Sequence, residues 1–182
     1  QADVSKYNKD NSNFADAMLA QDAPLTMYSA ARVLLVEAEA AVRGWINADA
    51  KSLYEKAIAT SFSAKGLTYT DDVLQNYLAQ DGVKFQGTDN NKIQLIAKQR
   101  WINGYFEDGV EAWSDWRRLD YPIIVTGPYS KELSINHVPY RMPYDSSDRS
   151  ATPTQYEEAD KIQGPDSPNT RVWWDVKDNR EE

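Results

Sequence analysis

The strongest structural signal in this chain is the stretch at residues 99–122, QRWINGYFEDGVEAWSDWRRLDYP. It holds three of the chain's six tryptophans, interleaved with acidic residues. Aromatic rings at this density cost free energy when water surrounds them, so we expect Trp101 and Trp113 to be largely buried. Arg117 and Arg118 each carry a planar guanidinium that can pair with a nearby carboxylate. The stretch therefore predicts a packed helical corner with polar clamps at its edge.

The carboxylates of this stretch could suggest a glycosidase, which needs two acids about 5 to 9 Å apart across the sugar. Glu111 and Asp115 have the i, i+4 spacing, so a helix would place them side by side rather than opposed. Capping of a helix start and pairing with Arg117 or Arg118 account for both. The single histidine, His137, excludes a catalytic triad or a histidine metal cluster within the chain. We expect no enzyme activity, no catalytic residue, no metal site and no cofactor.

The composition is that of an ordinary globular protein. The 182 residues are 41% hydrophobic and 26% charged, and none is cysteine, so no disulfide can form. The net charge of -8 argues against nucleic acid as a partner, because phosphate binding needs clustered lysine and arginine. No apolar run approaches the roughly 18 to 20 residues that a membrane helix needs.

Helical periodicity begins before the aromatic stretch. From Met27 apolar residues recur every three or four positions, which predicts an amphipathic helix that ends at Gly44. Asp49 is suited to cap a second helix, which Gly66 ends. Two helices joined by a short turn predict an antiparallel pair of the tetratricopeptide type.

Two further helices are expected before the aromatic corner. Asp71 or Asp72 should cap a short helix. Asn90 or Asn91 should begin a longer helix that carries Trp101 on its buried face. After a break at a glycine, residues 111–119 should continue as another helix.

The chain changes character beyond the aromatic stretch. Residues 123–125 predict a short strand or extended run. Residues 145–169 are rich in Ser, Asp, Pro and Thr, so we expect a long loop with a helical turn at 156–162. Trp173 and Trp174 are the expected anchors of this tail.

Several tyrosines are candidate ligand contacts because they lie in or beside predicted loops, where binding residues usually lie. Sugar rings can stack on such aromatic faces. These candidates are Tyr121, Tyr129, Tyr140 and Tyr144. The alternative is that their rings hold irregular segments against the helices.

The ordered motifs resemble those of the C-terminal segment of SusD/RagB-like nutrient-binding lipoproteins. The family pattern Q-[KR]-W-[IL] followed by E-[AS]-W-x-[DE]-x-R-R is similar to residues 99–102 and 111–118. Residues 138–144 resemble the family's I-P-x-R-[LM]-P-Y-P element, and 172–175 resemble its terminal W-W-D. Residues 35–58 resemble its helix pair. We expect the motif residues to serve the scaffold; they are Trp101, Glu111, Trp113, Asp115, Arg117, Arg118, Trp173 and Trp174.

The resemblance implies a mainly α fold with little β, in which tetratricopeptide-like helix pairs pack with a loop-rich C-terminal region. It implies the C-terminal part of a SusD-like domain at 26–182, and the polar, asparagine-rich start of the chain predicts a loop or lead-in at 1–25. Family members are longer and carry an N-terminal lipidated cysteine, so the lipid that anchors the protein would lie outside this chain.

The same resemblance implies a function. It indicates a non-enzymatic, surface-exposed lipoprotein of the outer membrane that binds a glycan or another oligomeric nutrient. The partner it implies is a SusC-like TonB-dependent transporter, which receives the ligand. Two alternatives remain: a helical-repeat interaction scaffold built on residues 27–66 without a small ligand, and a glycoside hydrolase.

Overall fold

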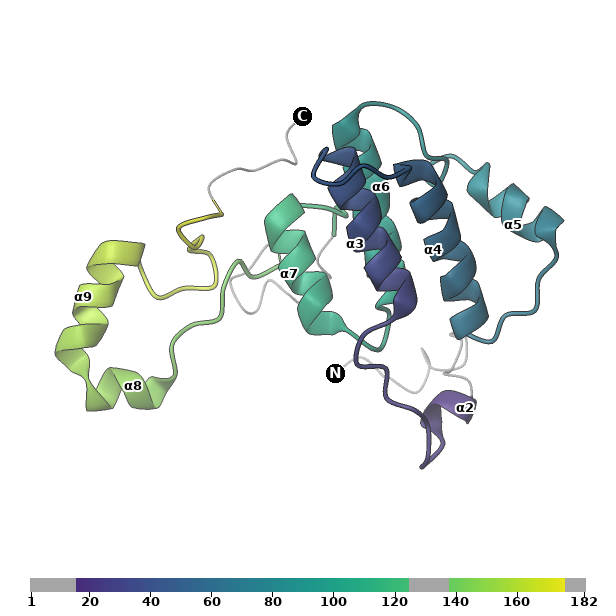
Figure 1. Cartoon of the computed structure of the whole chain (residues 1–182). Coiled ribbons are helices and arrows are strands. Elements are labelled where there is room, and N and C mark those ends of the chain that lie inside the picture. Colours follow the sequence, from purple (N-terminus) through teal and green to yellow (C-terminus); the bar gives the residue numbers. More distant parts are fainter. Residues whose placement is uncertain (1–15, 125–137, 176–182) are drawn as a thin grey trace, which may run out of the picture.

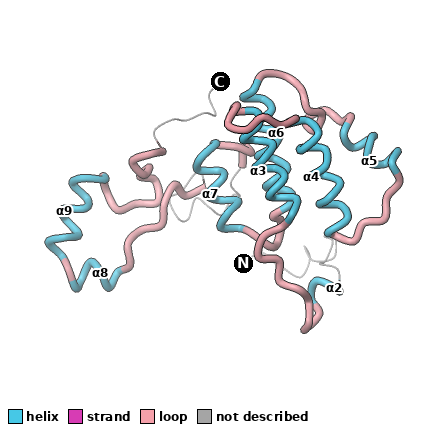
Figure 2. Tube along the Cα trace, in the orientation of Figure 1, coloured by secondary structure: helices cyan, strands magenta, loops and turns pink. Residues whose placement is uncertain are grey.

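The computed structural model describes residues 16–124 and 138–175. Within these ranges every regular element is a helix and no strand occurs (Figure 2). This confirms the mainly α fold. For residues 123–125 we predicted a short strand or an extended run; Ile123 and Ile124 belong to no strand, and residue 125 lies outside the described residues. The helices are α2 (Asp16–Leu19), α3 (Ala30–Val42), α4 (Ala50–Ala64), α5 (Asp71–Leu78), α6 (Asp89–Asn103), α7 (Gly109–Leu119), α8 (Ser146–Ala151) and α9 (Pro153–Gln163).

Helices α3 and α4 form the predicted antiparallel pair, and α6 lies behind α3 (Figure 1). Gly44 ends α3 with a positive φ of 72°. The neighbouring N–H of Trp45 bonds the Ala40 carbonyl, as in the glycine-ended helix termini that the sequence predicts. Asp49 caps α4 by accepting the N–H of Lys51 at 3.0 Å. The local signals of this region are therefore confirmed.

Three helices begin at other residues than we predicted, each directly after a serine or threonine at the N-cap position. Ser29 caps α3, so the helix begins at Ala30 and Met27 lies exposed before it. Thr70 precedes α5. Thr88 begins α6 with a capping box that it forms with Asn91. Asp71 and Asp72, one of which we expected to cap α5, lie instead inside its first turn. Asn90 and Asn91, at which we expected α6 to begin, lie inside the first turn of α6.

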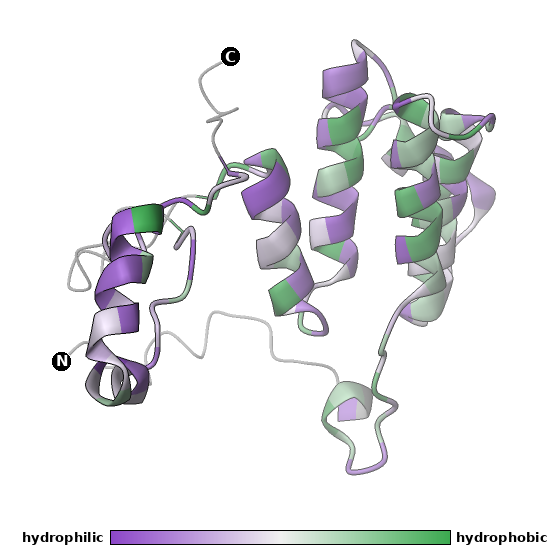
Figure 3. Cartoon of the chain, turned by 60° about the vertical axis from the view of Figure 1, so that its left-hand side comes forward, coloured by the Kyte–Doolittle hydropathy of each residue, from purple (hydrophilic) through white to green (hydrophobic). Residues whose placement is uncertain are grey.

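The hydrophobic core lies between α3, α4 and α6, with α5 along one side. Its fully buried side chains include Leu35, Tyr54 and Ile96. The Tyr54 hydroxyl donates to the Val83 carbonyl at 2.8 Å, so the one polar atom of this ring is satisfied. Figure 3 shows that these helices carry both hydrophobic and hydrophilic positions, as amphipathic helices of a bundle do.

The corner between α6 and α7 corrects our prediction for the tryptophans. Trp101 is 42% exposed and Trp113 is only half-buried, whereas Trp116 is 2% exposed. The buried face of α6 carries Gln99 and Arg100 together with Ile96. Because Trp101 lies about 100° around the helix from Arg100, burial of the arginine turns the tryptophan outward.

The C-terminal part, residues 138–175, is built differently. Helices α8 and α9 pack on each other, stand apart from the bundle in Figure 1, and contain no buried residue. The segment 138–144 forms an extended strap, held where the Tyr140 N–H bonds the Pro168 carbonyl at 2.9 Å. The predicted turn at 156–162 is part of α9, and α8 was not predicted.

Candidate functional site

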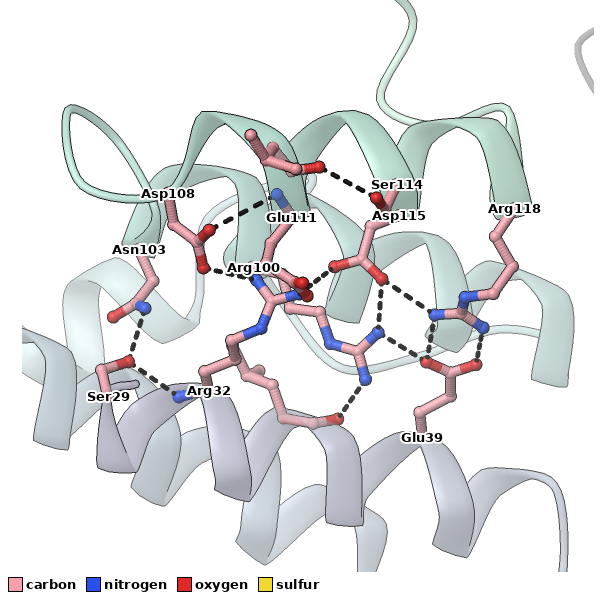
Figure 4. A network of polar contacts seen from close by, with 12 residues as sticks. Ser29, Arg32, Glu39, Arg100, Asn103, Asp108, Glu111, Ser114, Asp115 and Arg118 are labelled. Atoms are coloured by element: carbon pink, nitrogen blue, oxygen red, sulfur yellow. Dashed lines mark hydrogen bonds and ion pairs between the residues drawn. The ribbon is translucent and has the colours of Figure 1, made fainter. Parts of the chain in front are cut away.

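A buried network of ion pairs joins α3, α6 and α7 (Figure 4). At its centre Arg100 of α6 and Glu39 of α3 approach to 2.8 Å, and both side chains are almost fully buried. Arg100 also donates to Asp115 of α7 at 3.2 Å. Burying charges is costly unless each is paired, and here each central charge has at least two partners. The network therefore fixes the relative position of the three helices.

Glu39 pairs with three arginines, Arg43, Arg100 and Arg118. Arg118 contacts both of its oxygens, at 2.5 and 2.9 Å, and Arg43 donates to it at 2.8 Å. Burial alone would raise the pKa of Glu39, but the hydrogen bonds from Arg118 and the charge of Arg100 outweigh burial and lower this pKa to about 2. Glu39 is therefore ionised under all ordinary conditions.

Arg32 pairs with the two carboxylates that could have suggested catalysis. Its Nη2 lies 2.7 Å from Glu111 and 3.0 Å from Asp115. The side-by-side arrangement that the sequence predicted is confirmed, since both acids sit on one face of α7 and share one guanidinium. Their main partner is Arg32 rather than the tandem arginines, although Arg118 does contact Asp115 at 3.2 Å.

Arg117 contacts aromatic rings instead of the carboxylates that we expected. Its guanidinium carbon lies 3.8 Å from the centroid of the Trp113 ring and 5.4 Å from that of Trp174. The Trp113 indole donates to the Pro139 carbonyl at 2.6 Å. The two motif residues Trp113 and Arg117 thus attach the tail to α7.

A second polar centre lies in the tail around Asp166, whose side chain is buried. Asp166 pairs with Arg141 at 2.9 Å and accepts the Tyr144 N–H at 3.0 Å and the Tyr156 hydroxyl at 2.9 Å. Burial opposes its ionisation, yet these donors lower the pKa of Asp166 below its ordinary value. The sequence offered no signal for this residue, because it lies in a loop with many similar acids.

The structure separates the predicted ligand tyrosines. Tyr140 is 8% exposed, with the Trp116 ring stacked on it at 5.8 Å and the Arg171 guanidinium 4.0 Å from its centroid. That ring is a structural contact with too little free surface to stack on a sugar. Tyr144 is exposed and Tyr121 is half-buried, so both present ring surface. Tyr129 lies outside the described residues.

The terminal W-W-D element also behaves differently from the prediction. Trp173 is 84% exposed at a tight turn, which Asp175 closes by donating its N–H to the Val172 carbonyl at 2.9 Å. The anchor is Asp175, which is buried, pairs with Arg171 and is the acid of the motif. Trp173 is therefore not an anchor, and Trp174, which is 42% exposed, contributes through its contact with Arg117.

An open groove of about 320 Å³ runs between α3 and α7 above the ion-pair network. It is lined by Tyr28, Val36 and Trp45 and by charged side chains of the network. Among the described residues no group of histidines and acids is placed to hold a metal ion, and no helix there is long and apolar enough to cross a membrane.

Comparisons with known proteins converge on one family. A family model described as SusD-like, starch-binding and associating with the outer membrane matches residues 1–145. A solved SusD-like protein of Bacteroidetes, AC2a, is 29% identical with a TM-score of 0.79, over 97% of this chain and 37% of that chain. A SusD homologue from Bacteroides fragilis is 26% identical with a TM-score of 0.70, over 82% of this chain and 35% of its own. A chitin-binding protein is 28% identical with a TM-score of 0.64, over 81% of this chain and 33% of its own.

This chain thus spans about a third of the length of these structures, with the covered shares lying between 33% and 37%. A search of curated proteins finds no match.

Proposed function

This chain belongs to the SusD-like family, and we propose that it takes part in binding a nutrient, most simply a glycan, at the outer membrane. The observation that carries the proposal is the match over residues 1–145 to a family described as starch-binding and associating with the outer membrane. The similarity to a chitin-binding protein supports a glycan as the ligand class. An oligomeric peptide is the other nutrient that aromatic loops could hold.

Exposed rings of the tail are the proposed contacts with ligand. Tyr144, Trp173 and Trp174 are exposed, and Tyr121, which lies before the tail, is partly so. Pyranose rings present C–H groups that stack on such faces, and loops on a rigid support are the usual place for binding residues. Tyr129 stays a candidate on sequence grounds, whereas Tyr140 is withdrawn because its ring is covered.

Binding without hydrolysis is the second part of the proposal. Glu111 and Asp115 bind the same guanidinium, so neither is a free proton donor and neither opposes the other across a cleft. The remaining acids of the network are likewise engaged with arginines. This arrangement suits a scaffold that holds ligand-binding loops.

The proposed partner is a SusC-like TonB-dependent transporter, with this protein as a surface-exposed lipoprotein that delivers ligand to it. The family's association with the outer membrane supports a partner in that membrane. A stable contact would bury at least about 1,000 Å² in total. Affinity purification from outer membranes solubilised in detergent should recover a large β-barrel protein with this chain. Recovery of helical-repeat partners alone would favour the scaffold alternative.

Calorimetry tests the ligand proposal directly. Maltooligosaccharides and chitooligosaccharides should be titrated into the chain and into the Trp173→Ala and Tyr144→Ala variants. We expect one series to bind, with at least one variant weakening binding tenfold or more, and mass spectrometry should find the oligosaccharide lengths unchanged. Trp101→Ala is the matched control, because it removes an exposed tryptophan from α6 and leaves the tail intact. Shortened oligosaccharides, with turnover lost in Glu111→Gln, would overturn the non-enzymatic assignment.

A further inference from the structure

The end of α6 carries a pair of residues with a chemistry of its own. Asn103 is the last residue of α6, Gly104 follows it, and no other asparagine in the sequence precedes a glycine. Asparagine–glycine is the pair most prone to lose ammonia spontaneously, because the second residue has no Cβ to hinder attack by its backbone nitrogen. That nitrogen closes a five-membered ring on the side-chain carbon Cγ. The pair is therefore a candidate site of covalent modification.

The side chain of Asn103 holds three helices together. Its Nδ2 donates to the hydroxyl of Ser29 at 2.8 Å (Figure 4), and its Oδ1 accepts the hydroxyl of Ser61, in α4, at 2.9 Å. Ser29 is the N-cap of α3 and accepts the Arg32 N–H at 3.1 Å. Asn103 itself is only 7% exposed. This one amide thus fixes the end of α6 against α4 and against the start of α3.

The fold restrains both reacting groups. The Gly104 N–H donates to the Arg100 carbonyl at 2.9 Å, and the Gly104 carbonyl accepts the N–H groups of Glu107 and Asp108 at 3.1 and 2.9 Å. A nitrogen in such a bond keeps its proton and cannot turn toward Cγ of Asn103, which the two serines hold in place. Ring closure therefore requires the last turn of α6 to open, and helix ends are where local opening costs least.

We propose that Asn103 is a deamidation site, that it reacts only when the end of α6 opens, and that the reaction loosens the junction of α3, α4 and α6. In the first step the Gly104 nitrogen loses its proton and bonds to Cγ, while the Cγ–Nδ2 bond breaks and ammonia leaves. Water then opens the ring. Attack of water at Cγ gives aspartate, and attack at the backbone carbonyl carbon gives isoaspartate, whose main chain is longer by one methylene.

The surroundings do not favour the product. Aspartate at this position has no Nδ2 donor for Ser29, and it places a negative charge at the C-terminal end of α6, where the helix dipole is also negative. The nearby cations are already engaged, since Arg32 pairs with Asp108 at 3.5 Å and Lys65 pairs with Glu107 at 2.7 Å. Isoaspartate adds a change in main-chain length to this unfavourable charge. Both products therefore weaken the contact between α6 and the start of α3.

Peptide mapping by mass spectrometry tests the control by folding. The full chain should be incubated at mildly alkaline pH in buffer and in concentrated urea, and the conversion of Asn103 followed with time. We expect conversion to be roughly tenfold or more slower in buffer, whereas Asn47, in the exposed loop between α3 and α4, should differ by less than about twofold. Equal rates for Asn103 in the two solutions, or no conversion in urea, overturn the proposal.

Two variants separate the chemistry from its consequence. Gly104→Ala should slow conversion in urea roughly tenfold or more, because the added Cβ hinders attack by the nitrogen. Asn103→Asp reproduces one product and should lower the thermal midpoint by about 3 °C or more, whereas Asn47→Asp, at an exposed loop position, should stay within about 1 °C. Conversion that is unaffected by Gly104→Ala would contradict the succinimide route. A midpoint that Asn103→Asp leaves unchanged would contradict the loosening of the junction.

Discussion

The helical bundle and the C-terminal tail are stabilised in opposite ways. In the bundle, α3, α4 and α6 enclose an apolar core, and a buried ion-pair network fastens α7 beside it. In the tail, α8 and α9 bury no residue at all, and single polar centres such as Asp166 and Asp175 hold the backbone. The bundle is thus held by an apolar core and its ion pairs, whereas the tail, with α8 and α9, is held by isolated polar contacts.

This difference separates the scaffold from the proposed binding surface. Glu111 and Arg118 of α7 pair with side chains of α3, and Trp113 contacts the strap. The tail, in contrast, leaves Tyr144 and Trp173 exposed. Local opening is cheapest where few apolar groups are buried, so the tail should sample other conformations more readily than the bundle. Loops of that kind can adapt to a ligand while the scaffold stays fixed.

The largest loss of stability is expected from a substitution at the contact between the bundle and the tail. Trp116 is 2% exposed in α7 and stacks on Tyr140 of the strap. Trp116→Ala should lower the free energy of unfolding by about 3–5 kcal/mol, because it removes a large buried ring and leaves a cavity. The matched variant Trp101→Ala, at a 42% exposed site, should cost clearly less. Urea unfolding followed by circular dichroism measures both, and equal costs would show that the two tryptophans are equally packed.

The ion-pair network should give the next largest effect. Glu39→Gln leaves the buried Arg100 with Asp115 as its remaining acidic partner. We expect a loss of about 3 kcal/mol, since removing one member of a buried pair strands the other charge. Glu37→Gln is the control on the same helix, and its effect should stay within about 0.5 kcal/mol because Glu37 is exposed.

The pH dependence sharpens this test. The folded-state pKa of Glu39 is about 2, whereas its ordinary value is 4.5, so its contribution to stability is fully present above pH 4.5 and is lost as the pH falls toward 2. Over that pH window the free energy of unfolding of the unsubstituted chain should fall by up to about 3 kcal/mol more than that of the Glu39→Gln variant. Parallel stability curves for the two proteins would mean that Glu39 does not carry the acid sensitivity.

The sequence predicted the parts of the fold that depend on local signals. The α3–α4 pair, the glycine end at Gly44 and the cap at Asp49 follow from periodicity and cap chemistry. The prediction from sequence was wrong where contacts between residues far apart in the chain decide which side chains are buried. Glu39 of α3 and Asp115 of α7 both pair with Arg100, and these pairs account for the burial of Arg100 on α6. Trp101, the next residue, is then turned outward. Hydrophobicity alone would place Trp101 in the core and Arg100 at the surface.

The candidate site was harder to predict for a related reason. Aromatic residues in loops can either cover the backbone or be presented to solvent, and the sequence does not distinguish these cases. Tyr140 proved to be covered and Trp173 exposed, although both lie in segments of the tail that resemble family motifs. Asp175 pairs with Arg171, and its N–H closes the turn on which Trp173 is exposed.

A milder perturbation should open the tail alone. Asp166→Asn removes the charge that balances the buried Arg141 and weakens the contacts to Tyr144 and Tyr156. Amide hydrogen exchange in α8 and α9 should accelerate about tenfold, which corresponds to roughly 1.4 kcal/mol, while amides of α3 and α4 keep their protection. Asp148→Asn, at an exposed position of α8, is the control and should leave both regions unchanged. Faster exchange in the bundle would mean that bundle and tail unfold together.

The smallest effect on stability is expected at the residue with the most exposed ring of the tail. Trp173 is 84% exposed, and the turn that carries it is closed by the backbone of Val172 and Asp175. Trp173→Ala should therefore change the free energy of unfolding by less than about 0.5 kcal/mol, because almost no buried surface is lost. Asp175→Asn is the informative partner, since it disturbs the turn through the Arg171 ion pair and should cost more. If Trp173→Ala destabilises the chain as much as Asp175→Asn does, the ring is a structural anchor after all, and a role in ligand contact loses its basis. If it leaves stability intact while oligosaccharide binding weakens, the tail presents this ring for recognition rather than for folding.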